Sequence, residues 1–155
     1  MNKNIFIKAI FIGIVASIVF ILIQPFFGLS TLTSRHAAAY VNLGGYNETV
    51  ALILSWFVHV SVSTAYAILS AFIFSINSTI AVSTIQVFVL GWVTTLIATP
   101  ANEWVVKLVT TQTFPDISSL ASINTELGAK FWLHVMFFVL VIIGLYVVST
   151  KRDVK

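Results

Sequence analysis

Residues 50–75 read VALILSWFVHVSVSTAYAILSAFIFS and contain no Asp, Glu, Lys or Arg. A helix needs about 20 predominantly apolar residues to cross the hydrocarbon core of a bilayer, and this stretch is long enough. Three further apolar stretches cover about residues 5–28, 79–99 and 126–150. We therefore predict an all-α, polytopic membrane protein with four transmembrane helices in one bundle.

The composition agrees with this prediction. Of the 155 residues, 59% are hydrophobic and 8% are charged, whereas a soluble domain carries about 25% charged residues. Four spans leave no room for a separate soluble domain, so we expect a single membrane domain over residues 1–155. The chain has no cysteine, which excludes disulfides, thiolate metal sites and thiol catalysis.

Most of the cations lie near the two ends of the chain, namely Lys3, Lys8, Lys151, Arg152 and Lys155. Positive residues flank membrane helices on the cytoplasmic side, so we expect a multi-pass protein of the cytoplasmic (inner) membrane with both termini in the cytoplasm. The cations form no basic stripe with interleaved aromatic residues, and no nucleic-acid partner is expected. The expected partner is the lipid bilayer, and a homo-oligomer or a larger membrane complex stays open.

Small residues recur every fourth position in the first span, at Ala9, Gly13 and Ser17. Positions four apart share one face of a helix, and small side chains let a second helix approach closely. This spacing predicts a helix-packing face, although small residues are common in membrane helices and the pattern can arise by chance.

The segments between the spans are more polar. We expect a loop over about residues 29–49, in which His36 is solvated, and a second loop over about residues 110–125. Pro100 should end or kink the third span, which places Glu103 just beyond it.

The second span carries polar residues on one face, at Ser55, His59, Ser63, Tyr66 and Ser70. Lipid offers such groups no hydrogen-bond partners, so this face should point into the bundle.

The fourth span has a second polar series, Glu126, Lys130 and His134, spaced four apart. His59 and His134 lie about eight or nine residues from the start of their spans, roughly 12–14 Å deep, so the two histidines could meet. Glu103 and Glu126 would then lie above them, forming a polar funnel open toward the outside.

Four interpretations of this polar cluster stay open. It could be a site for protons or a small polar ligand, a bis-histidine site for haem b, or a metal site of two histidines and a carboxylate. It could also be a structural network that ties the helices together by hydrogen bonds. The chain has no Gly-rich phosphate loop, HExxH or GxSxG motif. We therefore predict no enzymatic activity and no resident cofactor, with haem b as the alternative.

The polar positions also resemble those of the YagU-like family of uncharacterised bacterial inner-membrane proteins. The resemblance covers roughly residues 55–146 and is carried by His59 followed by Ser63, Pro100, and Glu126 eight residues before His134. The first loop is shorter here, and Lys130 stands where the family member has an acidic residue. The resemblance implies a bacterial inner membrane and a link to acid tolerance, and it supplies no known reaction.

The function expected from the sequence is thus proton or small-solute handling by a membrane protein with an inward-facing His/Glu cluster. Two alternatives remain: a haem- or metal-binding electron-transfer subunit, and a structural or assembly partner of a larger membrane complex.

Overall fold

A computed structural model describes residues 3–114 and 123–150, and every regular element in these ranges is a helix. The elements are α1 (Lys3–Ile23), the 3-10 turn η1 (Gln24–Phe27), α2 (Leu32–Gly44), α3 (Glu48–Ile76), α4 (Ile80–Thr111) and α5 (Ala129–Thr150). Within the described ranges, α1 with η1, α3, α4 and α5 are long and apolar enough to cross a membrane. The predicted all-α fold with four transmembrane helices is confirmed.

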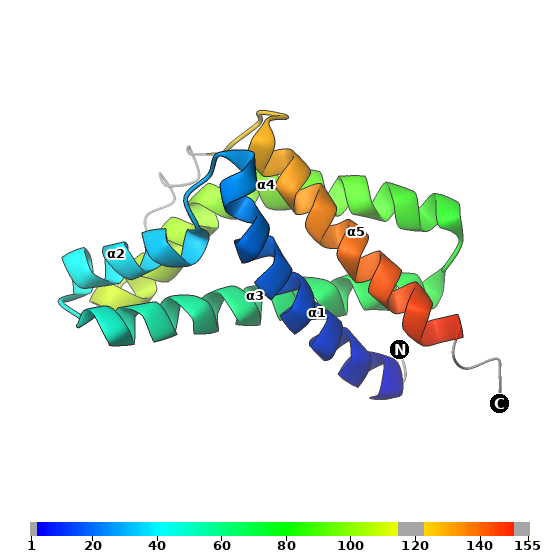
Figure 1. Cartoon of the computed structure of the whole chain (residues 1–155), viewed down its shortest axis with the longest axis horizontal. Helices are drawn as coiled ribbons and strands as arrows, with labels where there is room; N and C mark the ends of the chain where they lie inside the picture. The colour runs from blue at the N-terminus through cyan, green and yellow to red at the C-terminus, as the bar shows by residue number, and fades with distance from the viewer. Residues whose placement is uncertain (1–2, 115–122, 151–155) are drawn as a thin grey trace.

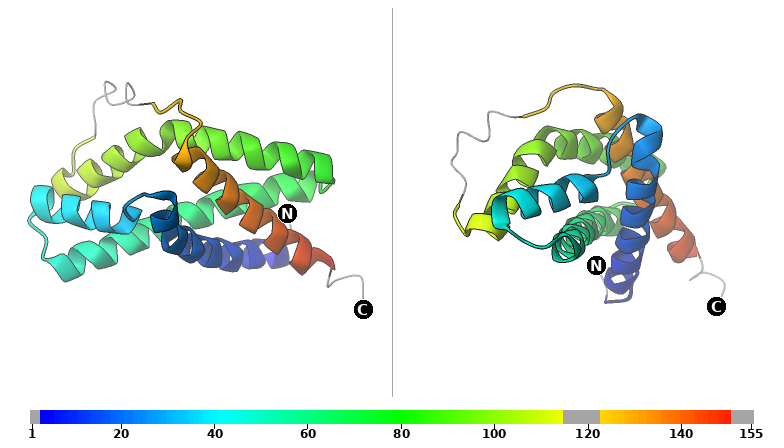
Figure 2. Two further views of the ribbon diagram at one scale, coloured as in Figure 1. Left: turned by 45° about the horizontal axis from the view of Figure 1, so that its top comes forward. Right: turned by 60° about the vertical axis from the view of Figure 1, so that its left-hand side comes forward.

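Helix α1 packs mainly against α3, and α5 packs mainly against α4 (Figure 1). Helices α3 and α4 are joined by a short turn, and α1 and α5 lie beside each other at an angle to them. The start of α1, the α3–α4 turn and the end of α5 lie at the same end of the bundle (Figures 1 and 2). An even number of spans produces this arrangement.

The segment predicted as a polar loop over residues 29–49 contains a helix, α2, so this prediction was wrong. The hydroxyl of Thr31 accepts a hydrogen bond from the backbone N–H of Ser34 at 3.4 Å, which caps the start of the helix. Gly45, with a φ of 65°, ends it in the left-handed conformation that glycine adopts readily. Three consecutive alanines between these caps, Ala37 to Ala39, favour the helix.

Helix α2 packs against α3 and α4 where these two extend past the rest of the bundle. The 29 residues of α3 and 32 residues of α4 correspond to roughly 43 and 48 Å, longer than a hydrocarbon core of about 30 Å. Tyr40 of α2 is fully buried against Ala51 of α3 and Val106 of α4. This second, smaller core closes the end of the bundle that faces away from the start of α1.

The third span does not end at Pro100. Helix α4 continues through this buried proline to Thr111, and its ribbon bends in the middle, between the green and the yellow-green parts in Figure 2. Membrane helices tolerate proline where neighbouring groups compensate for the lost backbone hydrogen bond. The predicted kink agrees with the bend, whereas the predicted end at residue 99 was wrong. Glu103 therefore lies on the helix, one turn past the proline.

The fourth span begins later than predicted. Helix α5 starts at Ala129, and Glu126 lies before it, exposed, with its backbone N–H donating to Asn124 Oδ1 at 3.0 Å. Glu126 is therefore not on the helical face that carries Lys130 and His134, and this part of the prediction was wrong. Most of the predicted second loop, residues 115–122, lies outside the described residues.

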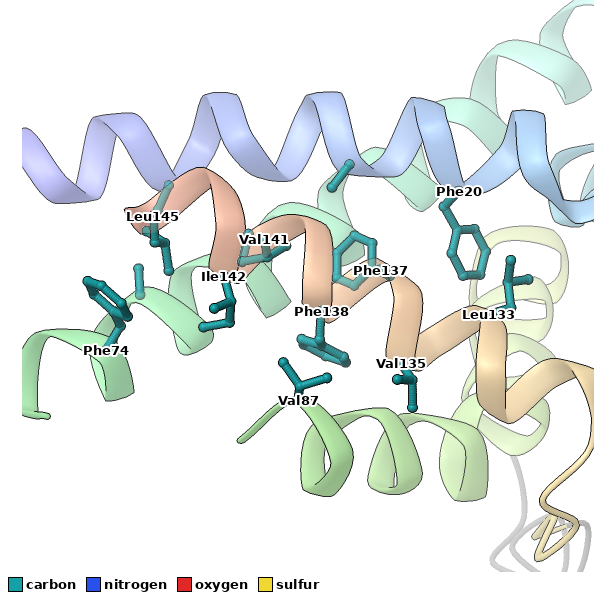
Figure 3. Close-up of a cluster of buried hydrophobic side chains, with 14 of the residues drawn as sticks. Phe20, Phe74, Val87, Leu133, Val135, Phe137, Phe138, Val141, Ile142 and Leu145 are labelled. Atoms are coloured by element: carbon teal, nitrogen blue, oxygen red, sulfur yellow. The ribbon is translucent and has the colours of Figure 1, made fainter. Parts of the chain in front are cut away.

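Helix α5 supplies much of the main hydrophobic core. Figure 3 shows it with α1 along one side and α4 along the other, and the side chains of Phe138, Val141 and Leu145 are almost completely buried. Because lipid is as apolar as these side chains, the close packing itself, rather than removal of water, stabilises the contact. Near the C-terminal end of α5, the Val148 carbonyl oxygen accepts a hydrogen bond from the Lys8 ammonium of α1 at 3.1 Å.

The small residues of α1 lie at its contact with α3. Ala9, Gly13 and Ser17 are all buried. A Cβ atom on Gly13 would lie 2.8 Å from the backbone Cα of Thr64 and 2.9 Å from Cβ of Ala67. A similar approach joins α4 to α5, where a Cβ on Gly91 would lie 3.2 Å from the backbone N of Val135. The contact of α1 with α3 and that of α4 with α5 are thus both formed at glycines, where there is hardly any space for a side chain.

Candidate functional site

A cavity of about 120 Å³ lies between α1, α3, α4 and α5, and both histidines of the membrane spans line it. The structure brings five of the predicted polar residues to this cavity: His59, Ser63 and Tyr66 from α3, and Lys130 and His134 from α5. Glu103 lines a neighbouring cavity instead, and Glu126 lines neither.

His59 is anchored to α1. Its Nε2–H donates to the backbone carbonyl oxygen of Ser17 at 3.1 Å, and its ring lies 5.5 Å from Phe20 and 6.5 Å from Trp56, measured between ring centroids. A carbonyl oxygen only accepts, so we assign the Nε2–H tautomer to the neutral ring, with Nδ1 as its acceptor.

His134 is anchored to α4. Its Nδ1 lies 2.9 Å from the hydroxyl of Thr95, and this hydroxyl donates its own proton to the Gly91 carbonyl oxygen at 2.7 Å. A hydroxyl has one proton to give, so it accepts from His134. The neutral imidazole therefore carries its proton on Nδ1 and keeps Nε2 as an acceptor.

Phe20 links the two histidines, because its ring centroid lies 5.5 Å from that of His59 and 5.6 Å from that of His134. Each imidazole is thus hydrogen-bonded to a different helix, and both pack against one aromatic ring. In their neutral forms, the two residues present one acceptor nitrogen each.

We expect the two histidines to differ in tautomer. In ¹⁵N-histidine NMR spectra of the full chain at neutral pH, His59 should show the Nε2–H pattern and His134 the Nδ1–H pattern. Replacing Thr95 by Val removes the hydroxyl acceptor, so the His134 signals should move toward a mixture of tautomers while those of His59 stay in place. The same tautomer at both residues, or an unchanged His134 in Thr95→Val, would contradict the assignment.

A second cavity of about 340 Å³ adjoins the first, and Arg35, Asn102 and Lys130 line both. Its other polar residues are His36, Thr99, Glu103 and Lys107. The prediction that His36 is solvated was wrong: it is 6% exposed, and neither ring nitrogen has a hydrogen-bond partner. Burial, together with the positive charge of Arg35, lowers the pKa of His36 to about 4.

The pKa of His36 predicts a loss of stability in acid. The folded pKa of about 4 lies below the unfolded value of about 6.5, so the unfolded chain binds the proton first. The contribution of His36 is complete above pH 6.5, falls as the pH drops toward 4, and amounts to at most about 3 kcal/mol. The unfolding midpoint in detergent should fall between pH 7 and pH 4.5, and it should fall less in His36→Leu. Equal acid sensitivity of the two proteins would count against this reading.

Several residues at the cavities were missed from the sequence. Arg35 and His36 were assigned to a loop, although Thr31, the three alanines and Gly45 signal a capped helix. Thr94 and Thr95 interrupt an apolar run, and this pair of hydroxyls is a signal that could have marked the α4 side of the cavity. Gln24 also lines the first cavity, and its Oε1 accepts a hydrogen bond from the backbone N–H of Leu32 at 2.7 Å.

The haem and metal alternatives fit the residues poorly. The Phe20 ring packs against both imidazoles, so a porphyrin between them would have to displace it. A two-histidine metal site would need a nearby carboxylate, but within residues 3–114 and 123–150 no three His, Cys, Asp or Glu side chains lie close enough to hold a metal ion.

The first cavity thus combines hydroxyls from Ser63 and Tyr66, cations from Arg35 and Lys130, and imidazoles that can accept and donate protons. Such a set can hold a small polar molecule and exchange protons with it. No protein-family model, curated protein or solved structure matches this chain.

Proposed function

We propose that this chain is a non-enzymatic protein of a bacterial inner membrane that binds a small polar solute between its helices and exchanges protons at the same place. One observation carries the proposal: His59 and His134 come from different helices and line one cavity within the bundle. Ionisable residues in membrane spans are costly, and they usually mark solute or proton paths. The resemblance to the YagU-like family supports the choice of membrane.

The proposed site opens away from the cytoplasm. Leu29, Leu32 and Arg35 line the cavity, and they lie in the α1–α2 connection and in α2, at the end of the bundle opposite the start of α1. The cations near the chain ends favour a cytoplasmic location for both termini, so this side of the cavity faces outward.

Reporter fusions test this orientation. A reporter fused after Lys155 should report a cytoplasmic location. A reporter inserted within residues 110–125 should report a location on the outer side of the membrane. If both reporters give the same side, the proposed threading fails.

A flux measurement tests the function itself. The full chain is reconstituted into vesicles that contain a pH-sensitive dye, and a panel of small acids, bases and neutral polar solutes is added outside. We expect at least one solute to change the internal pH faster than in protein-free vesicles. The double variant His59→Gln/His134→Gln should slow this change by roughly tenfold, because both proton-exchanging groups are lost.

The control is Ser75→Ala, an exposed hydroxyl that bonds only within its own helix, to the Phe72 carbonyl oxygen. This variant should match the wild type. Equal rates for the wild type and the double histidine variant with every solute would reduce the histidines to structural residues.

A further inference from the structure

The cations that do not lie near the chain ends gather around the two cavities. Arg35, Lys107 and Lys130 are these three residues; Arg35 and Lys130 line both cavities, and Lys107 lines the second. Among the described lining residues, Glu103 is the only carboxylate. Three cations and one carboxylate leave a net charge of +2 at the joined cavities.

These charges are not neutralised by the part of the chain that the structure describes. Within residues 3–114 and 123–150, the side-chain nitrogens of Arg35, Lys107 and Lys130 make no ion pair or hydrogen bond. Arginine and lysine that converge without protein partners are suited to an anion, since charge-assisted hydrogen bonds to carboxylate or phosphate are the strong ones.

Buried polar groups at the same cavities also lack partners. Thr94, which is 8% exposed, lines the first cavity, and His36, which is 6% exposed, lines the second; Thr94 Oγ1 and both nitrogens of His36 have no hydrogen-bond partner. Nearly all buried polar groups in native proteins are hydrogen-bonded, and each exception needs an explanation, of which a bound water, ion or ligand is one. A ligand that occupied both cavities would lie beside both residues.

Apolar side chains also line the first cavity. Phe20, Leu133 and Phe137 line it, whereas Arg35 and Lys130 stand toward α2 and the start of α5. A ligand that suits both parts has a charged end and a hydrocarbon end.

We infer that the joined cavities bind a small organic anion, with its carboxylate or phosphate group between Arg35 and Lys130 and its compact apolar body against Phe20 and Phe137. This inference rests on the proposed function, because it names the class of solute that the site takes.

Isothermal titration of the full chain in phosphatidylcholine nanodiscs tests the inference. The probes are benzoate and phenyl phosphate, with benzamide as the uncharged and benzylamine as the cationic counterpart of the same ring. Benzoate or phenyl phosphate should bind roughly tenfold more tightly than benzamide, since only the anions form charge-assisted bonds. Arg35→Gln and Lys130→Gln should each weaken binding of the anion by roughly tenfold. Lys3→Gln, an exposed cation at the far end of α1, should leave the affinity unchanged.

The outcomes separate this inference from the proposed function. Binding of benzamide or benzylamine as tight as that of both anions would contradict the preference for an anion, but it would agree with the proposed binding of a small polar solute. Absence of binding by all four probes would overturn the anion, and the flux measurement would then decide the proposed function alone. Loss of anion binding in nanodiscs of anionic phosphatidylglycerol would show that the cations hold an anionic lipid headgroup, which also overturns the inference.

Discussion

Replacing Gly13 by Leu should lower the stability of the folded bundle by about 3 kcal/mol or more, at the upper end of the cost of overpacking. Helix α1 approaches α3 so closely here that even a Cβ atom would lie 2.8 Å from the backbone Cα of Thr64. A backbone atom cannot move aside without shifting its helix, so the side chain would push α1 and α3 apart. Denaturant unfolding in mild detergent, followed by far-UV circular dichroism or by tryptophan fluorescence, measures the loss.

The matched control for this substitution is Val15→Leu. Val15 lies on the same helix, is 61% exposed on the lipid-facing side, and should tolerate the change with little loss. Gly13→Ala should fall between the two, because it adds only the atom that already collides. Similar stabilities for Gly13→Leu and Val15→Leu would show that α1 does not pack against α3 through this face.

Replacing Gly91 by Val should destabilise the protein by about 2 kcal/mol or more and also disturb the candidate site. A Cβ on Gly91 would lie 2.8 Å from Cγ2 and 3.2 Å from the backbone N and Cα of Val135, so α5 must shift away from α4. Val135 follows His134, whose Nδ1–H donates to Thr95 on α4 at 2.9 Å. The shift should weaken this bond, visible as a change in the ¹⁵N signals of His134 with those of His59 retained.

Gly128→Val offers the same substitution in open space, because no atom lies within 4 Å of a Cβ at Gly128. It should leave both the stability and the histidine signals close to those of the wild type. A Gly91→Val protein as stable as Gly128→Val, with unchanged His134 signals, would mean that the α4–α5 contact does not hold the histidine.

The four spans could be predicted because a helix that crosses a bilayer must be long and apolar, and such a stretch is recognisable from composition. Composition does not show where each helix begins or ends. Pro100 terminates most helices in water, but in α4 the chain continues past it. Glu126 fits the four-residue spacing of α5, yet the helix begins three residues later, after Gly128. Spacing alone cannot show where a helix starts.

The candidate site shows the same limit. Helical spacing brought His59 and His134 to the interior, because a polar face has no partner in lipid. Spacing could not show that Phe20 lies against both rings, or that Ser17 and Thr95 hold them, since these contacts join different helices. Arg35 and His36 could not be placed at the site from the sequence, because α2 carries no apolar run long enough to span. This helix is stabilised instead by its packing on α3 and α4.

The hydrogen bond from Lys8 to the Val148 carbonyl oxygen joins residues that are 140 positions apart, which sets an order for the assembly of the protein. During synthesis α1 leaves the ribosome before α5, so the Lys8 ammonium must stay among the lipid headgroups until α5 has entered the membrane. In the folded bundle α5 lies so close to α1 that a Cβ on Gly144 would be 3.0 Å from the Ile12 side chain. Until α5 is in place, this face of α1 lacks its α5 contact. A chain cut short before α5 would therefore expose this face to the chaperones and proteases that survey new membrane proteins.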